Sequence, residues 1–431
     1  MRRFVLLALL IYGLVFGALG ALEGGLLALA IPLVLLAGAA LLFGPDRLDL
    51  TAERRVNAER IRDGMAVPVT VTVTNHGGRL DDVLIEETPP PGVEVVEGRT
   101  SLLTALGPGE SAELAYTVRA GRGRFDFGPV HVTAQDAAGL LVRRAGLQPG
   151  GPSRLDILPE VLRVRRVDIR PRQTRIYAGT IPAGVGGPGV EFFGVRGYEP
   201  SDALRHVNWR ASARHEGSLY TNEFQQERIA DVGLILDARE RTNARQNGES
   251  LFEHGVRATA ALAESFLSHG NRVGLLLYGY LLDYTGPGYG KLQRERIVQA
   301  LARAGTGDSQ VFDNLRYLPT RFFPPRSQIV LVTPLTADDP DFLLYLRGRG
   351  YELLVISPDP VSFERRGLPD TPHVELAARI ARLERAVLFR RLRRAGVRVV
   401  DWDVAQPFER VVAAQLARQP AATRPMGVIT R

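Results

Sequence analysis

The chain has 431 residues, of which 45% are hydrophobic and 23% charged, so it is not a generally disordered chain and is long enough for two or three domains. Its formal net charge is +7, and all of its 54 basic residues except Lys291 are arginine. No Lys/Arg block resembles a nucleic-acid-binding arm, so we expect no nucleic-acid partner. The absence of cysteine excludes a thiol nucleophile, a thiolate metal site and a disulfide framework.

Two charge-free runs open the chain, Phe4–Leu22 with 19 residues and Leu26–Phe43 with 18. At about 1.5 Å per residue each helix reaches roughly 27–28 Å, close to the thickness of a bilayer core. Only residues 23–25 separate the runs, which predicts a hairpin of two transmembrane helices. A cleaved signal peptide that begins with Arg2 and Arg3 is the alternative for the first run.

Positive charges lie on one side of this hairpin. Glu23 is the charged residue of the turn, whereas the outer ends are flanked by Arg2, Arg3, Arg47, Arg54 and Arg55. Because cytoplasmic flanks carry an excess of arginine, we expect both ends in the cytoplasm. The sequence therefore predicts a two-pass protein of the inner cell membrane, with lipid around its hairpin and its soluble domains in the cytoplasm.

Short β-strand patterns follow, from Leu48 to about Arg144. In Val67–Thr74 every second residue is valine, and the run stops at an Asn-His-Gly-Gly turn. Similar short runs occur at Val83–Glu87, Val93–Val96, Ala112–Arg119 and Val130–Ala134. About seven strands in about 100 residues predict an immunoglobulin-like β-sandwich, a module that spaces or binds.

A Pro- and Gly-rich cluster at Gln148–Ser153 predicts a domain boundary, after which the pattern changes. Apolar strands are expected at Val232–Leu236, Arg272–Tyr278, Gln328–Thr333, Tyr351–Ser357 and Val397–Trp402. Helices are expected at Glu249–His269, Leu292–Ala304, Asp338–Arg347, Glu375–Ala395 and Pro407–Ala417. This alternation is typical of a doubly wound α/β domain. We expect transmembrane helices at 1–45, the β-sandwich at 48–147, a linker at 148–188, a signature segment with the α/β domain at 189–417 and a flexible tail at 418–431.

The segment from 189 to 229 concentrates arginines, carboxylates and a tryptophan. Ser201 after Pro200 predicts a helix start, and on that helix Arg205 would bridge Asp202 and Trp209. The segment is either an ion-pair network that locks it onto the α/β domain or a partner-binding surface. Its candidate residues are Glu191, Phe192, Arg196, Tyr198, Asp202, Arg205, Asn208, Trp209, Ser212, Arg214, Glu227 and Arg228.

This pattern resembles the signature of the bacterial family named domain of unknown function 58. The matching elements are Gly-x-Glu-Phe at 189–192, Arg-x-Tyr-x-x-x-Asp at 196–202, Arg-x-Val-x-Trp at 205–209 and Ser-Ala-Arg at 212–214. Residues 122–130 and 136–140 resemble the family's sandwich signature, so the resemblance covers essentially the whole chain. It implies a membrane hairpin, a β-sandwich and a von Willebrand factor A-like α/β domain, and it suggests a MoxR-type AAA+ ATPase as protein partner.

Such α/β domains can bind a divalent ion through Asp-x-Ser-x-Ser after the first strand. Here the motif has Asp237 but carries Arg239 and Arg241 at both serine positions, and Thr306 is the one match for the loop threonine. A guanidinium beside the aspartate repels Mg²⁺ and can pair with it. We therefore expect a degenerate metal site and no cofactor. The two arginines either receive an acidic side chain of a partner or neutralise Asp237 and Glu240.

The predicted helix at 375–395 is rich in arginine. Its apolar face is Ile380, Leu383, Val387, Leu388 and Leu392, and its arginines are Arg379, Arg382, Arg385, Arg390, Arg391, Arg393 and Arg394. The arginines form either a solvated face or a basic surface for anionic head groups or an acidic partner.

No nucleophile–base pair or complete phosphate-binding loop is visible in the sequence. We therefore expect a membrane-anchored, non-enzymatic scaffold that works with the ATPase in assembling or maturing a cell-envelope or other protein complex. A metal-dependent binding receptor of the von Willebrand factor A type is the alternative.

Overall fold

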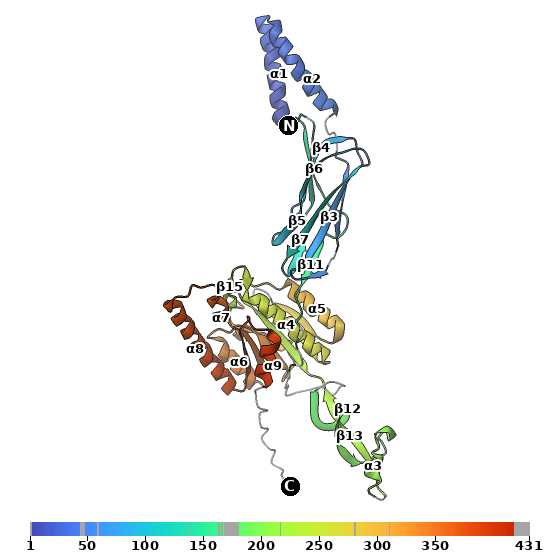
Figure 1. Cartoon of the computed structure of the whole chain (residues 1–431), viewed down its shortest axis with the longest axis vertical. Coiled ribbons are helices and arrows are strands. Elements are labelled where there is room, and N and C mark those ends of the chain that lie inside the picture. The colour runs from blue at the N-terminus through green and yellow to red at the C-terminus, as the bar shows by residue number, and fades with distance from the viewer. Residues whose placement is uncertain are drawn as a thin grey trace. The chain divides into compact units, whose positions relative to one another are not determined.

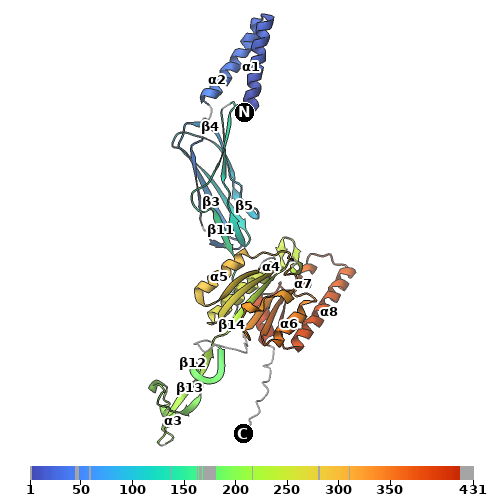
Figure 2. The same ribbon diagram turned by 180° about the vertical axis from the view of Figure 1, so that it is seen from behind.

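The computed structural model describes residues 2–43, 48–57, 60–136, 138–162, 164, 167, 181–215, 217–279, 282–309 and 311–417 (Figures 1 and 2). The chain divides into two units, Met1–Leu158 and Pro159–Arg431. The expected tail falls outside the described residues, as do Arg47 and residues 163, 165, 166 and 168–180 of the expected linker.

Two apolar helices, α1 (Arg2–Ala21) and α2 (Gly24–Phe43), open the first unit. Their central stretches have a mean hydropathy of 2.5 and bury only 6% and 11% of their residues within the protein. Apolar side chains left outside a protein core favour a lipid environment over water. Both helices are therefore long and apolar enough to cross a membrane, as the sequence predicts.

The rest of the first unit consists of β-strands in three sheets. One sheet has the order β1 (Leu50–Val56), β3 (Ala66–Asn75), β7 (Ser111–Ala120) and β5 (Val93–Gly98), and another has β10 (Val142–Leu147), β9 (Val130–Gln135), β4 (Leu80–Glu86) and β6 (Ser101–Leu106). The alternating valines of β3 are buried and share one core with β4 and β9. The strand pattern of this region is thus confirmed.

A third sheet corrects the expected domain boundary. It joins β2 (Arg60–Arg62), β11 (Arg154–Leu158) and β8 (Gly123–Asp126), so the chain returns to this unit after the Gly/Pro cluster. Leu155 and Ile157 of β11 are fully buried in the same core. The boundary therefore lies at Leu158, because these apolar side chains need that core, and the linker expected from residue 148 was placed too early.

Arg54, one of the charged flanks of α1 and α2 expected from the sequence, is buried within this unit. Its guanidinium lies 2.6 Å from Glu87, and both side chains are at most 1% exposed. It also donates to the carbonyl of Gly128 at 2.7 Å and stacks over Phe127. The charge bias expected around the hairpin therefore rests on the remaining arginines.

The second unit contains a six-stranded sheet. Its strand order is β18 (Leu282–Gly288), β17 (Arg272–Gly279), β14 (Asp231–Ala238), β19 (Gln328–Val332), β20 (Glu352–Pro358) and β21 (Arg398–Trp402). All neighbours are parallel except β18, which pairs antiparallel with β17. The Gly-Pro-Gly ending of β18 hides its strand pattern, and the sequence did not predict this edge strand.

Helices cover both faces of this sheet. They are α4 (Leu251–Ser268), α5 (Gly290–Arg303), α6 (Asp339–Gly348), α7 (Pro360–Arg365), α8 (Pro372–Arg394) and α9 (Phe408–Ala417). Leu234 and Leu236 of β14 pack in a core with α4 and α9, whereas Ile235 packs in a second core with α6 and α8. This division explains the continuous apolar strands and confirms a doubly wound α/β architecture.

The signature segment forms an antiparallel hairpin, β12 (Ile181–Gly197) with β13 (Tyr220–Arg228). Between them lie a 3₁₀ turn at Leu204–His206 and the short helix α3 (Trp209–Ser212). The single helix expected from Ser201 to Trp209 is therefore wrong. The remaining short elements are β15 (Arg245–Gln246), β16 (Glu249–Ser250) and 3₁₀ turns at Glu240–Thr242, Leu315–Tyr317 and Thr320–Phe322.

Candidate functional site

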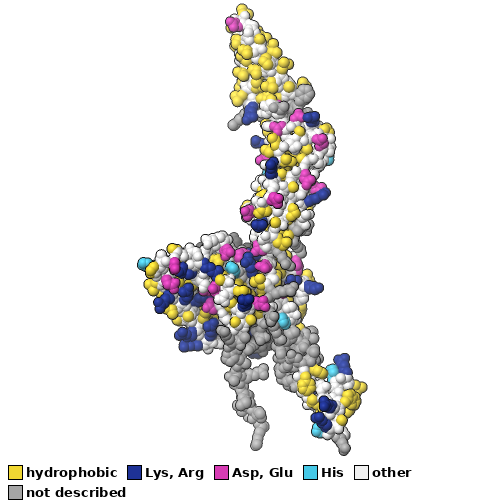
Figure 3. Space-filling model, in the orientation of Figure 1, with side chains coloured by type: hydrophobic (Ala, Val, Ile, Leu, Met, Phe, Trp, Pro, Cys, Tyr) yellow, Lys and Arg dark blue, Asp and Glu magenta, His cyan; other side chains and the backbone are white. Residues whose placement is uncertain are grey.

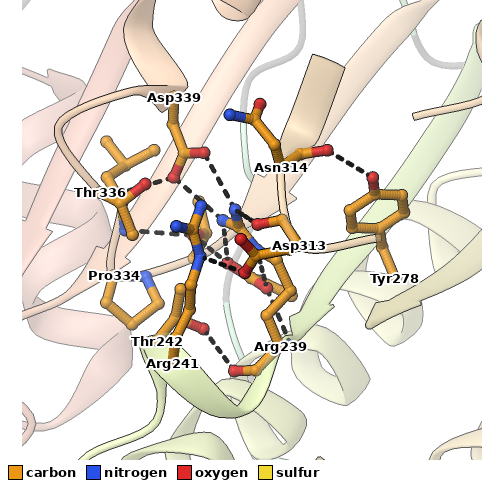
Figure 4. A network of polar contacts seen from close by, with 12 residues as sticks. Arg239, Arg241, Thr242, Tyr278, Asp313, Asn314, Pro334, Thr336 and Asp339 are labelled. Atoms are coloured by element: carbon orange, nitrogen blue, oxygen red, sulfur yellow. Dashed lines mark hydrogen bonds and ion pairs between the residues drawn. The ribbon is translucent and has the colours of Figure 1, made fainter. Parts of the chain in front are cut away.

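A buried polar cluster of the α/β unit lies at the carboxyl ends of β14 and β19. In the sheet, β14 lies between β17, the next strand of this sheet along the chain, and β19, the strand that follows after β18. Connections diverge at such a point, which is where open α/β sheets bind ligands. Asp237, Arg239, Thr333 and Asp339 meet there, and each is at most 4% exposed. Figure 4 shows Arg239 and Asp339 in this cluster. We call these four residues the rim cluster.

The guanidinium of Arg239 lies between two carboxylates. Its Nε and Nη2 donate to Asp237 at 2.9 and 2.7 Å, and its Nη1 and Nη2 donate to Asp339 at 3.1 and 2.9 Å. Nη1 also donates to the carbonyl of Asp313 at 3.1 Å. The planar fork of arginine is suited to such paired contacts, which a lysine ammonium would not reproduce.

Both carboxylates are held in place by further donors. The hydroxyl of Thr333 donates to Asp237 at 2.6 Å and accepts from the backbone N–H of Leu335 at 3.1 Å. The backbone N–H of Thr336 donates to Asp339 at 2.7 Å. Asp339 also begins α6, where the helix dipole favours a negative charge. These contacts fix the positions of both carboxylates.

The electrostatics of the rim cluster keep Arg239 charged. Burial lowers the pKa of Arg239, but its hydrogen bonds and charge interactions with Asp237 and Asp339 outweigh burial and raise that pKa. Tyr278 donates to the carbonyl of Asn314 at 2.6 Å, and burial raises the pKa of Tyr278. The rim cluster thus contains a permanent cation and two anions in a water-poor place.

This donor set does not suit a divalent ion. The carboxylate oxygens that would bind an ion already accept hydrogen bonds from Arg239 at 2.7–3.1 Å. The positive charge of Arg239 would also repel Mg²⁺. Thr306, the candidate loop threonine, accepts from Arg245 at 3.1 Å. The pairing of Arg239 with Asp237 that the sequence offered is present, whereas the sequence did not single out Asp339.

The sequence alternative, in which Arg239 and Arg241 neutralise Asp237 and Glu240, holds for Arg239 with Asp237 but not for Arg241 and Glu240. Arg241 contacts Asp313 at 2.9 Å and is 32% exposed, and Glu240 contacts Arg245 at 3.0 Å. The 3₁₀ turn at Glu240–Thr242 is the local reason, because it places the two consecutive side chains on different neighbours.

The signature hairpin has its own ion-pair network. Arg196 on β12 donates twice to Asp202, at 2.9 and 2.6 Å, and the N–H of Glu199 donates to Asp202 at 2.9 Å. The hydrogen bond from Arg196 is the main cause that lowers the pKa of Asp202. Arg205 instead contacts His206 at 3.1 Å, so the expected bridge from Asp202 to Trp209 is absent because Asp202 is engaged by the strand.

Asn208 and Ser212 fasten α3 to β13. Asn208 accepts from the N–H of Ala211 at 2.9 Å and so caps α3, a role that the sequence gave to Ser201. Its amide also donates to Asn222 at 2.8 Å, and the hydroxyl of Ser212 accepts from the N–H of Tyr220 at 2.8 Å. These bonds tie the insertion to the hairpin.

Other signature residues face solvent. Phe192, Leu204 and Trp209 are 62%, 69% and 66% exposed, and Arg214 is exposed as well. Tyr198 donates to the carbonyl of Asp202 at 3.3 Å. The side chains of Glu191, Glu227 and Arg228 lie outside the described part of the structure. The signature thus combines an ion-pair network within the hairpin with exposed apolar side chains, and a partner-binding role for this surface stays a prediction.

Residues 194–376 match the family model described as protein of unknown function DUF58. The family resemblance is confirmed for this segment. The DUF58 segment runs from β12 into α8 and contains both the hairpin network and the rim cluster.

The chain is also similar to the uncharacterized protein YeaD of Bacillus subtilis, with 27% identity over 254 residues. That match covers 58% of this chain and 60% of YeaD, so the chain spans less than two thirds of its relative.

Similarities to solved structures are weak. A CARDB domain from Pyrococcus furiosus has a TM-score of 0.18 and 16% identity, covering 26% of this chain and 96% of that one. Trypsin-activated alpha-2-macroglobulin of Escherichia coli has a TM-score of 0.20 and 16% identity, covering 31% and 9%. A FixG-related protein from Vibrio parahaemolyticus has a TM-score of 0.17 and 11% identity, covering 25% and 95%. These values support no argument about fold or function.

Proposed function

We propose that this chain is a membrane-anchored, non-enzymatic interaction protein whose α/β domain binds its partner without a metal ion. The observation that carries this proposal is the guanidinium of Arg239, bound by Asp237 and Asp339 at the switch point of the sheet. The guanidinium of Arg239 supplies the positive charge between Asp237 and Asp339, so no divalent ion is needed there.

The α/β domain is, in this proposal, of the von Willebrand factor A-like type that the family resemblance implies. When the six strands of its sheet are numbered by their order in the chain, their order across the sheet is 3-2-1-4-5-6. The third strand, β18, is antiparallel and lies at the edge. The rim cluster lies where a metal-binding relative would hold its ion. The two facing sheets of the first unit support an immunoglobulin-like spacer between hairpin and α/β domain.

The proposed partner is a MoxR-type AAA+ ATPase, and the proposed role is the assembly or maturation of a protein complex in or near the cell envelope. The support for the partner is the family resemblance alone. The arginines that flank α1 and α2 favour a cytoplasmic location for both soluble units, where such an ATPase would meet them.

A metal-dependent receptor is the second candidate because Asp237, Thr333 and Asp339 still converge on one point. For an ion to bind there, Arg239 would have to leave two buried ion pairs. The cost of separating buried, hydrogen-bonded charges makes this candidate the weaker one.

The test is a binding measurement between the purified full chain in detergent and the MoxR-type ATPase of the same genome. Nucleotide is omitted, so the ATPase itself needs no Mg²⁺. We expect equal retention of the ATPase with and without EDTA. Loss of binding in EDTA that Mg²⁺ restores would establish the metal-dependent receptor, and no binding in either buffer would reject the proposed partner.

A further inference from the structure

The solvent face of α8 carries an apolar line of four residues. Thr371 caps the helix, which is 23 residues long and packs on the sheet through Phe389 and Leu392. On the opposite side, Leu376, Ile380, Leu383 and Val387 are 57%, 50%, 64% and 63% exposed. Their spacing of four, three and four residues places them in one straight row along about three helical turns. We call this row the α8 seam.

The α8 seam divides the apolar face expected from the sequence. Leu388 and Leu392 pack toward the sheet, whereas Ile380, Leu383 and Val387 point outward. The sequence could not make this division, because an arginine, Arg385, occupies the buried side. It donates to Asp401, Ser357 and the carbonyl of Pro334 at distances of 2.8–3.2 Å.

The width of the seam distinguishes between possible occupants. Four residues spaced four, three and four apart form a strip about 60° wide, the narrow a/d pattern through which one helix packs against another. A helix that lies in a membrane interface presents a much wider apolar face with aromatic residues. The α8 seam has no aromatic residue. Its geometry therefore favours a helix of a partner over a lipid surface.

Charge identifies the chemistry of that helix. α8 contains seven arginines and two glutamates, a net charge of +5 without His373. Among the described residues, none pairs with Arg379, Arg390 or Arg394, and Figure 3 shows basic side chains gathered over this part of the α/β unit. Arg390 and Arg394 also line an open cavity of ≈ 770 Å³ together with Arg385 and Phe389.

These charges argue against two other occupants, a second copy of α8 and the C-terminal segment of this chain. A second copy of α8 would bring another five positive charges to the same contact. Residues 418–431 contain three arginines and no acidic residue, so they do not complement the helix either.

We propose that the α8 seam is the docking surface for an acidic amphipathic helix of a partner protein. The partner's apolar residues pack on Leu376, Ile380, Leu383 and Val387, and its flanking carboxylates pair with Arg379, Arg390 and Arg394. This inference rests on the proposed interaction role and adds to it the surface and the chemistry of the partner.

The test uses two fluorescent designed helical peptides with leucine at a and d positions. One carries glutamate and the other lysine at the flanking positions. Binding of each peptide to the full chain in detergent is measured by fluorescence anisotropy. We expect saturable binding of the acidic peptide only, weakened about tenfold or more by a rise to high salt.

The double substitution Ile380→Ser/Leu383→Ser should weaken this binding at least about tenfold. The matched control is Leu292→Ser on α5, which removes an equally exposed leucine (65%) from another helix of the same unit. Both variants should keep the wild-type melting temperature because the replaced side chains are exposed. Equal binding by the seam variant and the control would overturn the proposal.

Two further measurements exclude other occupants. Vesicles with anionic lipid that bind the α8 region more tightly than the acidic peptide does would assign the seam to a membrane. Sedimentation showing a dimer that the seam variant abolishes would assign it to a second copy. If the ATPase still binds the seam variant, the proposed interaction role stands, but docking of that partner on the α8 seam is rejected. The two proposals can therefore be distinguished.

Discussion

Arg239 is the residue on which the proposed function depends. Its neighbour in sequence, Asp237, could be paired with it from the motif alone. Asp339 lies 100 residues further on and reaches the same guanidinium from the first turn of α6. No local pattern marks such a contact, because it arises only when β14 and β19 become neighbours in the sheet.

Replacing Arg239 tests how much these contacts stabilise the α/β unit. Arg239→Ser leaves the buried carboxylates of Asp237 and Asp339 facing each other without a cation. We expect a loss of about 3–5 kcal/mol of unfolding free energy, measured by urea denaturation of the full chain in detergent. The control is Arg241→Ser, which removes a partly exposed pair with Asp313 and should cost less than about 1 kcal/mol. Equal losses would show that burial of the pair does not matter.

A second buried ion pair stabilises the β-sheet unit. Glu87→Ala leaves Arg54 charged and buried without its anion, so we expect about 3–5 kcal/mol of destabilisation. The double variant Arg54→Met/Glu87→Leu should recover most of that loss, because it removes both charges. A chemical-denaturation series on the three proteins measures this. A double variant as unstable as Glu87→Ala would refute the charge argument.

At the scale of elements, regular patterns were predicted well. The alternating valines of β3 and the apolar strands β14, β19 and β20 formed as expected because each pattern has one way to bury its side chains. The segment from β12 to β13 was not predicted. Its strand partners are irregular, with register shifts near Gly186 and Phe192, and glycine-rich stretches give no alternation.

The element α4 carries a titratable residue in an apolar place. Burial lowers the pKa of His254 below its ordinary value of 6.5, and the nearby charge of Arg257 adds to this effect. The ring lies edge-on to Phe363 and Trp402, at 6.0 and 6.1 Å between centroids. His254 is therefore held in its neutral form.

Acidification should weaken this packing. The unfolded chain takes up the proton at a higher pH than the folded chain, so stability is full above about pH 6.5 and falls as the pH drops through the folded pKa. We expect His254→Gln to show a smaller fall in urea midpoint between neutral and mildly acidic pH than the wild type. An unchanged slope would mean that other groups cause the pH dependence.

At the scale of the whole molecule, the domain order of helices, β-sheets and α/β unit was predictable because each part has its own hydrophobic period. The exact boundary was not, since β11 returns to the first unit after a typical breaker sequence. The position of Arg54 was not predictable either. Its place in the sequence suggested a charge that flanks a transmembrane helix, whereas its side chain is buried beside Glu87.

The orientation in the membrane has a direct test. A fluorescent protein fused after Arg431 should fluoresce, and alkaline phosphatase at the same place should be inactive, because Arg2, Arg3 and Arg55 favour the cytoplasm. The opposite activities are expected for the same reporters inserted at Gly24, in the turn. An active phosphatase at the C-terminus would reverse the orientation and remove a cytosolic ATPase from consideration.

In the proposed function, the guanidinium of Arg239 takes the place of a metal ion. The most direct measurement is a calorimetric titration of the full chain with Mn²⁺, with Arg239→Ser as the comparison. We expect no saturable binding to the wild type. The variant places a serine hydroxyl beside Asp237, Thr333 and Asp339, so it gains a set of hydroxyl and carboxylate ligands and binds the ion. Binding of one ion per wild-type chain that is lost on Asp339→Asn would contradict the claim.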